Sequence, residues 1–248
     1  MWLLKILVTR RQNLVLKKQE SKDNENTIQE QLSHLLEHYK NRRFNETERL
    51  AISITQEFPR HLFGWKVLGA LLKQMGKNAE AINAYEKVIE ISPQDAEAHS
   101  NLGVMLQELG RLEEAEASYT QAITLKPDYF EVHYNLGVTL QELGKLDEAQ
   151  ASYTQAIRLE PDYADAHYNL GYTLKELGRL EAAEASYKQA IALNPFYAEA
   201  HYNLGITLQE LRRLDEAEAS FRQAIAFKPD YAEAHSNLGV MLQELGRL

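Results

Sequence analysis

The chain has 248 residues, an apolar fraction of 44% and a net charge of −9 from 36 acidic and 27 basic side chains. The excess of carboxylates repels phosphate backbones, so the composition disfavours nucleic acid as a partner. The chain has no cysteine, which excludes disulfides, thiolate metal sites and cysteine nucleophiles and fits a reducing compartment.

Residues 1–27 form a basic N-terminal segment followed by a polar linker that begins at Ser21. Its apolar stretch, residues 2–8, is interrupted by Lys5 and is too short for a signal peptide or a membrane span. We therefore expect a cytoplasmic chain with no spanning helix. Three alternatives stay open for this segment: a cationic amphipathic helix on an anionic membrane surface, a segment packed on the first repeat, or a loose tail.

All six prolines of the chain lie 34 residues apart, and the triplet Asn-Leu-Gly recurs with the same period. Proline cannot continue a helix, so a proline at a fixed interval marks a fixed helix end. The chain is therefore predicted to be an array of one supersecondary unit. The prolines are Pro59, Pro93, Pro127, Pro161, Pro195 and Pro229.

Residues 96–129 show the unit most clearly. Apolar residues recur at helical spacing up to Gly110, and a glycine just past a helix end can adopt the left-handed conformation without steric cost. A second amphipathic segment begins near Leu112 and ends before Pro127. The aspartate after several of these prolines, with an acid three residues later, predicts an N-cap of the next helix. These aspartates are Asp128, Asp162 and Asp230.

Small residues recur where the two helices of a unit must approach closely. A glycine on the first helix (Gly103, Gly137, Gly171, Gly205) is matched by an alanine on the second (Ala115, Ala149, Ala183, Ala217). A ring on the second helix is expected to fill the remaining space, because protein interiors are close-packed. These rings are Tyr85, Tyr119, Tyr153, Tyr187 and Phe221.

This 34-residue pattern resembles the tetratricopeptide repeat (TPR). In residues 62–95 the marks of that family read Trp65, Leu68, Gly69, Leu72, Ala81, Tyr85, Val88 and Pro93. The resemblance covers 62–231 as five full repeats, which we number 2 to 6 (62–95, 96–129, 130–163, 164–197 and 198–231), and 232–248 as the first helix of an incomplete repeat. It implies an all-α fold, a right-handed TPR superhelix that is an α-solenoid of antiparallel helix pairs.

The two ends of the array depart from the pattern. Residues 28–61 keep the proline period but lack Leu-Gly, so we interpret them as a degenerate capping repeat, and the whole array as residues 28–248. Interior-type residues such as Leu242 lie where the sequence stops in mid-repeat. We therefore expect a fragment of a longer array or protein. Self-association through this end is a further alternative, which Leu242→Glu is expected to weaken.

One turn also departs from the pattern, because Arg212 replaces the turn glycine. Keeping the left-handed turn with a non-glycine residue costs roughly 1 kcal/mol.

The resemblance also implies a binding face. In TPR proteins the concave surface comes from positions 2, 5, 6, 9, 12 and 13 of each repeat, and here position 6 is asparagine in five consecutive units. A carboxamide donates and accepts hydrogen bonds, so a line of them can pair with the main chain of an extended peptide. This is similar to O-linked N-acetylglucosamine transferases, in which an asparagine ladder at this position holds the substrate polypeptide. The alternative is that these asparagines only bond an adjacent helix or face water.

The predicted peptide-binding residues are the asparagines and their neighbours on this face. They are Asn101, Asn135, Asn169, Asn203, Asn237, Tyr134, Tyr168, Tyr172, Tyr202, Gln107, Gln141, Lys175 and Gln209. The family's other known mode, clamping of a carboxylate by inner-face cations, is disfavoured because Lys175 stands alone among acids and amides.

Two histidine patterns suggest metal but have simpler explanations. His99, His133, His167, His201 and His235 recur once per repeat, but packed helices lie about 8–10 Å apart, too far for equivalent histidines to share one zinc ion. We expect them to pack at the family's aromatic position. His34 to His38 matches the string H-x-x-E-H, yet the repeats that follow leave no room for the fold of a peptidase.

We therefore predict a non-enzymatic scaffold for protein–protein interaction, with no catalytic residue, no metal and no cofactor, that binds an extended peptide or a partner helix. The competing hypothesis is a substrate-recruiting arm of a glycosyltransferase similar to the O-linked N-acetylglucosamine transferases, with the catalytic part outside this sequence. The reading frame beyond Leu248 would distinguish the two.

Overall fold

The computed structural model describes residues 28–35, 37–38 and 40–247. Over these residues the chain is made of helices and turns and holds no β-strand, which confirms the predicted all-α fold class. The predictions for residues 1–27 lie outside the described residues. The chain divides into two compact units after Ala98, which we call unit 1 (the described residues up to Ala98) and unit 2 (from His99 onward), and each is treated by itself.

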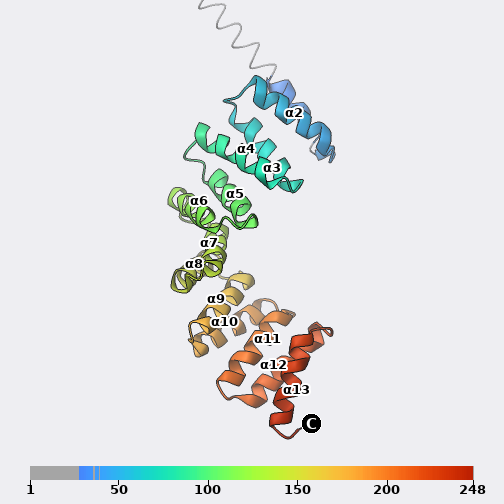
Figure 1. Cartoon of the computed structure of the whole chain (residues 1–248), viewed down its shortest axis with the longest axis vertical. Helices are drawn as coiled ribbons and strands as arrows, with labels where there is room; N and C mark the ends of the chain where they lie inside the picture. Colours follow the sequence, from blue (N-terminus) through green and yellow to red (C-terminus); the bar gives the residue numbers. More distant parts are fainter. Residues whose placement is uncertain (1–27, 36, 39, 248) are drawn as a thin grey trace, which may run out of the picture. The chain divides into compact units, whose positions relative to one another are not determined.

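The helices follow one another along the chain in the order that the repeat predicts (Figure 1). Unit 1 holds α2 (Phe44–Glu57), α3 (Leu62–Gln74) and α4 (Asn78–Ile91), and α5 (Ala96–Glu108) crosses the division. Unit 2 continues with α6 (Leu112–Leu125), α7 (Phe130–Glu142), α8 (Leu146–Leu159), α9 (Ala164–Glu176), α10 (Leu180–Leu193), α11 (Ala198–Glu210), α12 (Leu214–Phe227) and α13 (Ala232–Glu244). We call α7, α9, α11 and α13 the A helices and α6, α8, α10 and α12 the B helices. Each A helix begins at the first residue of a predicted repeat or of the incomplete one.

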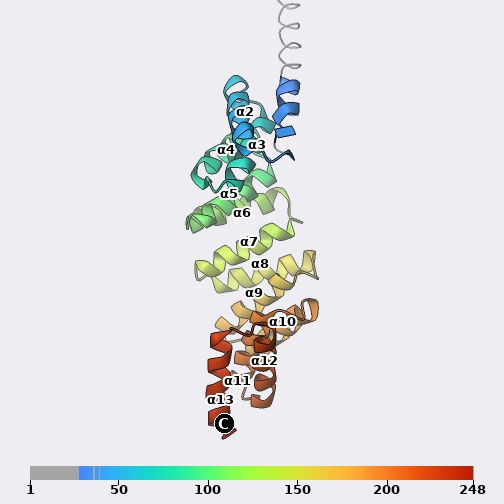
Figure 2. The ribbon, with the colours of Figure 1, turned by 90° about the vertical axis from the view of Figure 1, so that its right-hand side faces the viewer.

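Helices of unit 2 pack as consecutive neighbours (Figure 2). Each A helix from α7 to α11 packs on the B helix that follows it, and each B helix packs on the next A helix. Successive A helices also touch, α7 against α9 and α9 against α11. Contacts between nearest neighbours are what define a helical solenoid, so side chains of the A helices form one continuous face.

The predicted pairing of glycine and ring holds within each repeat of unit 2. A Cβ atom added to Gly137 would lie 2.6 Å from the Tyr153 ring, and one added to Gly171 would lie 2.8 Å from the Tyr187 ring. Real Cβ contacts are never so short, so only glycine lets the ring reach the A helix. The partner alanines Ala149 and Ala183 are fully buried.

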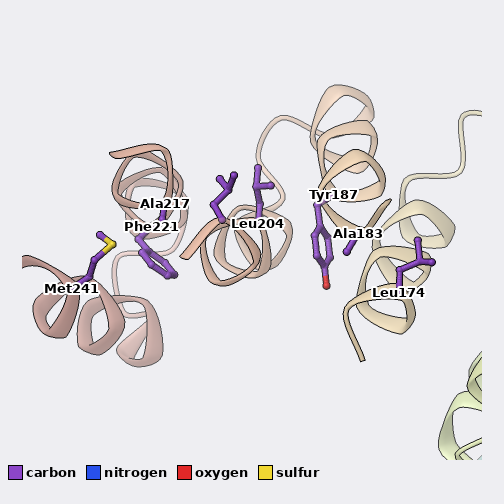
Figure 3. Packing of buried hydrophobic residues seen from close by; sticks show 8 residues of the cluster. Leu174, Ala183, Tyr187, Leu204, Ala217, Phe221 and Met241 are labelled. Carbon is purple, nitrogen blue, oxygen red and sulfur yellow. The ribbon is translucent and has the colours of Figure 1, made fainter. Parts of the chain in front are cut away.

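The rings connect one repeat to the next through a shared core. Tyr187 and Phe221 are fully buried in one cluster with Leu174, Leu204 and Met241. Figure 3 shows Met241 of α13 beside the ring of Phe221 of α12. Burying such a side chain contributes about 1.5–3 kcal/mol, which explains why the short helices are stable only as part of the stack.

The turn between the two helices of a repeat uses a left-handed residue. Gly144 and Gly178 have φ of 74° and 71°, and Arg212 keeps the same turn with φ of 62°. The backbone N–H of Arg213 donates to the carbonyl of Leu208 (2.9 Å), as Lys145 does to Leu140 (2.8 Å). Arg212 therefore retains the conformation and carries its steric cost.

The turn between repeats differs from the predicted N-cap, which was wrong. The N-cap residue of α7 is Tyr129, not Asp128, and no side chain caps the helix. The N–H of Tyr129 donates to the carbonyl of Lys126 (3.3 Å), which makes Pro127 and Asp128 the two central residues of a β-turn. Asp128 lies one residue too early to reach the free N–H groups. The same shift applies at Tyr163 and Tyr231, which replace Asp162 and Asp230 as N-caps.

Ion pairs add a second connection between repeats. Lys145 pairs with Glu116 (2.7 Å) and Arg213 with Glu184 (2.6 Å), in each case from the N-cap residue of one B helix to the previous B helix. Partly exposed pairs of this kind contribute about 0.2–1 kcal/mol each. They fix the register of neighbouring repeats more than they stabilise the fold.

None of the helices in the described part of the chain is both long enough and apolar enough to cross a bilayer.

Candidate functional site

The predicted binding residues lie along the A helices of unit 2. Tyr134, Tyr168 and Tyr202 at position 5 and Gln141, Lys175 and Gln209 at position 12 are partly exposed. Most of the asparagines at position 6 are partly exposed as well, whereas Asn203 is 9% exposed. We call this surface of α7, α9, α11 and α13 the A-helix face.

Each of three asparagines is hydrogen-bonded to a tyrosine of the preceding repeat. The amide nitrogen Nδ2 of Asn169 donates to the hydroxyl of Tyr134 (3.0 Å). Asn203 and Asn237 donate in the same way to Tyr168 and Tyr202, both at 3.0 Å. The alternative that the asparagines bond an adjacent helix therefore holds for the amide nitrogens of these three residues.

This bond changes what the asparagines can offer to a ligand. Asn203 also donates to the carbonyl of Glu199 (3.0 Å), so both hydrogens of its amide are used. The carbonyl oxygen Oδ1 is then the atom through which it can bind a peptide, by accepting an N–H. The sequence-based expectation that one amide both donates and accepts does not fit the geometry of Asn203.

The tyrosines supply the donor that the asparagines have lost. A hydroxyl that accepts a hydrogen bond keeps its own hydrogen to donate. Burial is the main cause that raises the pKa of Tyr134 and Tyr168 above the ordinary value, so both stay protonated at neutral pH. Each Tyr–Asn pair thus places one donor and one acceptor on the A-helix face, joined by a bond that polarises both.

A second tyrosine holds each of these rings in place. The Tyr134 ring lies 4.8 Å from that of Tyr163, and the Tyr168 ring lies 4.9 Å from that of Tyr197. Tyr197 also donates to Asp165 (3.0 Å). Sequence reasoning missed these supporting rings, although a tyrosine two residues after the proline was a signal in the repeat.

The two glutamines at position 12 of repeats 3 and 4 serve the fold. The buried hydroxyl of Tyr119 donates to Oε1 of Gln107 (3.1 Å), and that of Tyr153 donates to Oε1 of Gln141 (3.2 Å). Gln141 also accepts from Thr173 of the next repeat (3.0 Å). Their acceptor oxygens are therefore occupied by the protein itself.

Repeat 5 departs from this arrangement. Lys175 stands where Gln141 stands in repeat 4, and Tyr172 stands where Val138 does. The hydroxyl of Tyr187, the ring that corresponds to Tyr153, is buried and has no hydrogen-bond partner among the described residues. The Lys175 ammonium lies 3.4 Å from Glu176 and 5.7 Å from the centre of the Tyr172 ring.

The N-terminal members of the predicted set have different surroundings. Asn101 and Asn135 are partly exposed, but the residue that corresponds to Tyr134 one repeat earlier is Ser100, whose hydroxyl is on a much shorter side chain. The Tyr–Asn pairs thus belong to repeats 4 to 6 and to α13.

Acidic side chains flank the pairs along the A-helix face. Glu131, Glu142 and Glu210 are exposed, whereas Glu199 pairs with Lys228 (3.0 Å). The pKa of Glu199 is lowered overall by its hydrogen bonds and by the lysine charge, against the opposing effect of burial. The face is therefore anionic and rich in hydrogen-bond acceptors.

The recurring histidines have a structural partner. Nε2 of His133 lies 2.9 Å from the carbonyl oxygen of Pro127, and His201 has the same contact with Pro195 at 3.0 Å. A carbonyl can only accept, so this nitrogen carries the hydrogen. Trp65 makes the equivalent bond to Pro59 at 2.9 Å. The constant spacing of six residues from proline to ring was a signal that sequence reasoning did not use.

No three His, Asp or Glu side chains in the described residues lie close enough together to hold a metal ion.

Family models identify the repeats directly. A model described as tetratricopeptide repeat matches residues 134–198, 168–232 and 202–248. A second, described as TPR repeat, matches 69–110 and 105–144, so that the matches run from residue 69 to residue 248 without a gap. The chain belongs to the tetratricopeptide-repeat family. A search of the curated proteins found no match.

Solved TPR structures share the fold of this TPR chain. A structure titled as YrrB, "a TPR protein with an unusual peptide-binding site", has a TM-score of 0.68 at 21% identity and covers 75% of this chain and 96% of its own. A structure of MamA has a TM-score of 0.64 at 26% identity and covers 67% of this chain and 97% of its own. MamA from Desulfovibrio magneticus RS-1 has a TM-score of 0.65 at 19% identity and covers 69% of this chain and 97% of its own. Since 497 solved chains match, similarity establishes the fold but does not select a partner.

Proposed function

We propose that this TPR chain is a non-enzymatic scaffold that holds an extended polypeptide along the A-helix face of unit 2. The family is one of protein-interaction scaffolds, and one structure of the same fold is titled by its peptide-binding site. The observation that carries the proposal is the repeated Tyr–Asn pair, which places one donor and one acceptor at the same point of successive A helices.

The pairing suits the main chain of a peptide. An extended strand presents N–H and C=O groups alternately, and both must be satisfied when they leave water. The Asn Oδ1 atom accepts an N–H of the peptide, and the Tyr hydroxyl donates to a C=O. Such contacts recognise the backbone, so a wide range of sequences can bind.

The charge of the face restricts that range. Exposed carboxylates beside the pairs, including Glu131, Glu142 and Glu210, repel an acidic peptide and attract lysine or arginine side chains. Partly exposed tyrosine rings add a surface on which a cation can rest. We expect neutral and basic peptides to bind more tightly than acidic ones.

The test uses a fluorescent pool of random peptides of about 15 residues, roughly 50 Å long when extended, and measures binding by fluorescence anisotropy. Replacing the three paired asparagines, Asn169, Asn203 and Asn237, by alanine is expected to weaken binding roughly tenfold or more, since each lost hydrogen bond contributes about 0.5–1.5 kcal/mol. Helical circular dichroism shows whether the array remains folded.

Two controls complete this test. Asn194 is the exposed C-cap residue of α10 and belongs to no A helix, so Asn194→Ala should bind like the wild type. If the triple asparagine variant unfolds, Phe at Tyr134, Tyr168 and Tyr202 removes the donors and keeps the rings. Binding at wild-type strength by a folded variant of either set would reject the Tyr–Asn pairs as the site.

A substrate-recruiting arm of a larger transferase would use the same face. That alternative concerns sequence beyond this chain and stays a prediction, as do self-association through the C-terminal end and the cytoplasmic location.

A further inference from the structure

We propose that repeat 5 holds a separate subsite of the A-helix face, in which the Tyr187 hydroxyl and the Lys175 ammonium donate hydrogen bonds to a main-chain carbonyl oxygen of the bound peptide. This inference rests on the proposed function, because it names the chemistry of one point along the same peptide.

The first observation is a buried hydroxyl without a partner. The Tyr187 side chain is 0% exposed, and its oxygen has no hydrogen-bond partner among the described residues. Leaving a buried hydroxyl unsatisfied destabilises a protein, so such a group needs an explanation. Packing does not require it, because the equivalent residue in repeat 6, Phe221, is buried to the same extent without a hydroxyl.

Repeat 5 differs from repeats 3 and 4 at position 12 of its A helix. In repeats 3 and 4 the hydroxyls of Tyr119 and Tyr153 donate to a glutamine at position 12. In repeat 5 that position is Lys175, and an ammonium has no lone pair to accept with. Repeat 2 in unit 1 also has a lysine at position 12, Lys73, but the ring of that repeat, Tyr85, has an interaction partner. The buried unsatisfied donor is therefore a property of repeat 5.

The Tyr187 hydroxyl takes its expected direction from the equivalent ring in repeat 4. By comparison with Tyr153 and Gln141 it points toward the position-12 side chain of its own A helix, which is part of the A-helix face. Burial raises the pKa of Tyr187, and so do the neighbouring groups Tyr168, Tyr172 and Glu176. These neighbours also belong to A helices, and the raised pKa keeps the hydroxyl a donor at neutral pH.

Lys175, at position 12 of this repeat, has only long polar contacts. Its side chain is 18% exposed, and its contacts with Glu176 (3.4 Å) and with the Tyr172 ring (5.7 Å) are both long. A lysine side chain has many rotamers, so it can move aside and follow an incoming acceptor. Two donors would then converge on one oxygen atom.

A carbonyl oxygen fits better than a carboxylate. The charge of Lys175 is opposed by Glu176, and the nearby Glu210 is exposed and anionic, so a second negative charge would be repelled. A main-chain carbonyl carries no charge. It also accepts a donor from the scaffold, and both amide hydrogens of the nearby Asn203 are already used within the fold.

The test compares two matched phenylalanine variants with the same fluorescent peptide pool. Tyr187→Phe removes the unsatisfied donor and is expected to weaken binding roughly tenfold. Tyr153→Phe removes a hydroxyl that is already paired within the fold and should change binding less than about twofold. Lys175→Met, which removes the ammonium, should weaken binding as Tyr187→Phe does.

A second peptide pool identifies the acceptor. Replacing main-chain amides by esters weakens the carbonyl acceptors, and it also removes N–H donors, a loss that both proteins share. A pool with esters at alternate positions should therefore lose affinity for the wild type, and lose less for Tyr187→Phe. An equal loss for both proteins overturns the assignment of a main-chain carbonyl.

The outcomes separate this inference from the proposed function. If Tyr187→Phe and Lys175→Met bind as the wild type does while the triple asparagine variant has lost binding, the proposed subsite is wrong. The A-helix face is then still supported as the peptide-binding site. If the wild type itself binds no peptide, the proposed function fails and the subsite with it.

Discussion

Repeats 4 and 5 have the same helices, the same turns and the same glycine–ring contact, yet they satisfy one buried hydroxyl differently. In repeat 4 the Tyr153 hydroxyl donates to Gln141, whereas in repeat 5 position 12 is Lys175 and the Tyr187 hydroxyl has no partner among the described residues. The packing of the array is therefore determined by the small and large side chains that the two repeats share. The polar pair on the A-helix face can vary without changing the fold.

The largest expected effect acts on both repeats alike, through alkaline pH. Burial raises the pKa of Tyr163 of repeat 4 to about 12 and raises that of Tyr197 of repeat 5 still further. The folded protein then keeps protons that the unfolded chain loses near pH 10. The stabilisation is complete below pH 10 and falls as the pH rises toward 12, so the array should unfold cooperatively in that range.

Circular dichroism and tyrosine absorbance recorded together would check this expectation. Both signals should change in one transition, because the buried hydroxyls ionise as the array opens. Ionisation of Tyr163 and Tyr197 near pH 10 with full helicity retained would contradict the burial of their rings.

The next effect in size tests the shared packing. Gly137→Ala and Gly171→Ala each force a Cβ atom against a buried ring, so each should destabilise the array by about 2 kcal/mol in urea denaturation. The matched control is Gly239→Ala in α13, where nothing lies within 4 Å of the added atom. There the substitution should stabilise by about 0.5–1 kcal/mol through helix propensity.

Equal losses of unfolding free energy for Gly137→Ala and Gly171→Ala would show that the two repeats differ only in their polar side chains. A neutral effect at either position would show that its ring is not held where the structure places it.

The periodicity of the sequence was sufficient to predict this packing. The first residue of each A helix, the left-handed glycines and the Gly–Tyr contacts follow from period and side-chain volume alone. The TPR family resemblance also located the side chains of the A-helix face. These features repeat, and each is specified by residues close together in the sequence.

The direction of individual hydrogen bonds could not be predicted in the same way. Asn169 and Tyr134 are 35 residues apart, and the sequence does not show whether the amide points to that hydroxyl or to solvent. The N-cap was wrong for a related reason: Pro127 and Asp128 fit a cap and a β-turn equally well until the N–H of Tyr129 is located. Polar geometry depends on atoms from neighbouring repeats, whereas packing follows from size.

A smaller effect concerns the turn that ends the A helix of repeat 6. Arg212 is left-handed, so Arg212→Gly should stabilise the array by about 1 kcal/mol. The reverse change, Gly178→Arg in repeat 5, places a side chain in open space at the same conformation and should cost a similar amount. Thermal denaturation of the two variants should shift in opposite directions. A shift of the same sign would mean that unfolded-state entropy outweighs the backbone strain.

The unfolding free energies of Tyr153→Phe and Tyr187→Phe, measured side by side in urea, test the central comparison most directly. Tyr153→Phe breaks a buried hydrogen bond and leaves Gln141 without that donor, so it should cost about 1 kcal/mol. Tyr187→Phe removes an unsatisfied hydroxyl and should be neutral or stabilise the array by up to about 1 kcal/mol. Equal destabilisation by the two changes would contradict the account, because it would show that the Tyr187 hydroxyl has a partner within the folded chain.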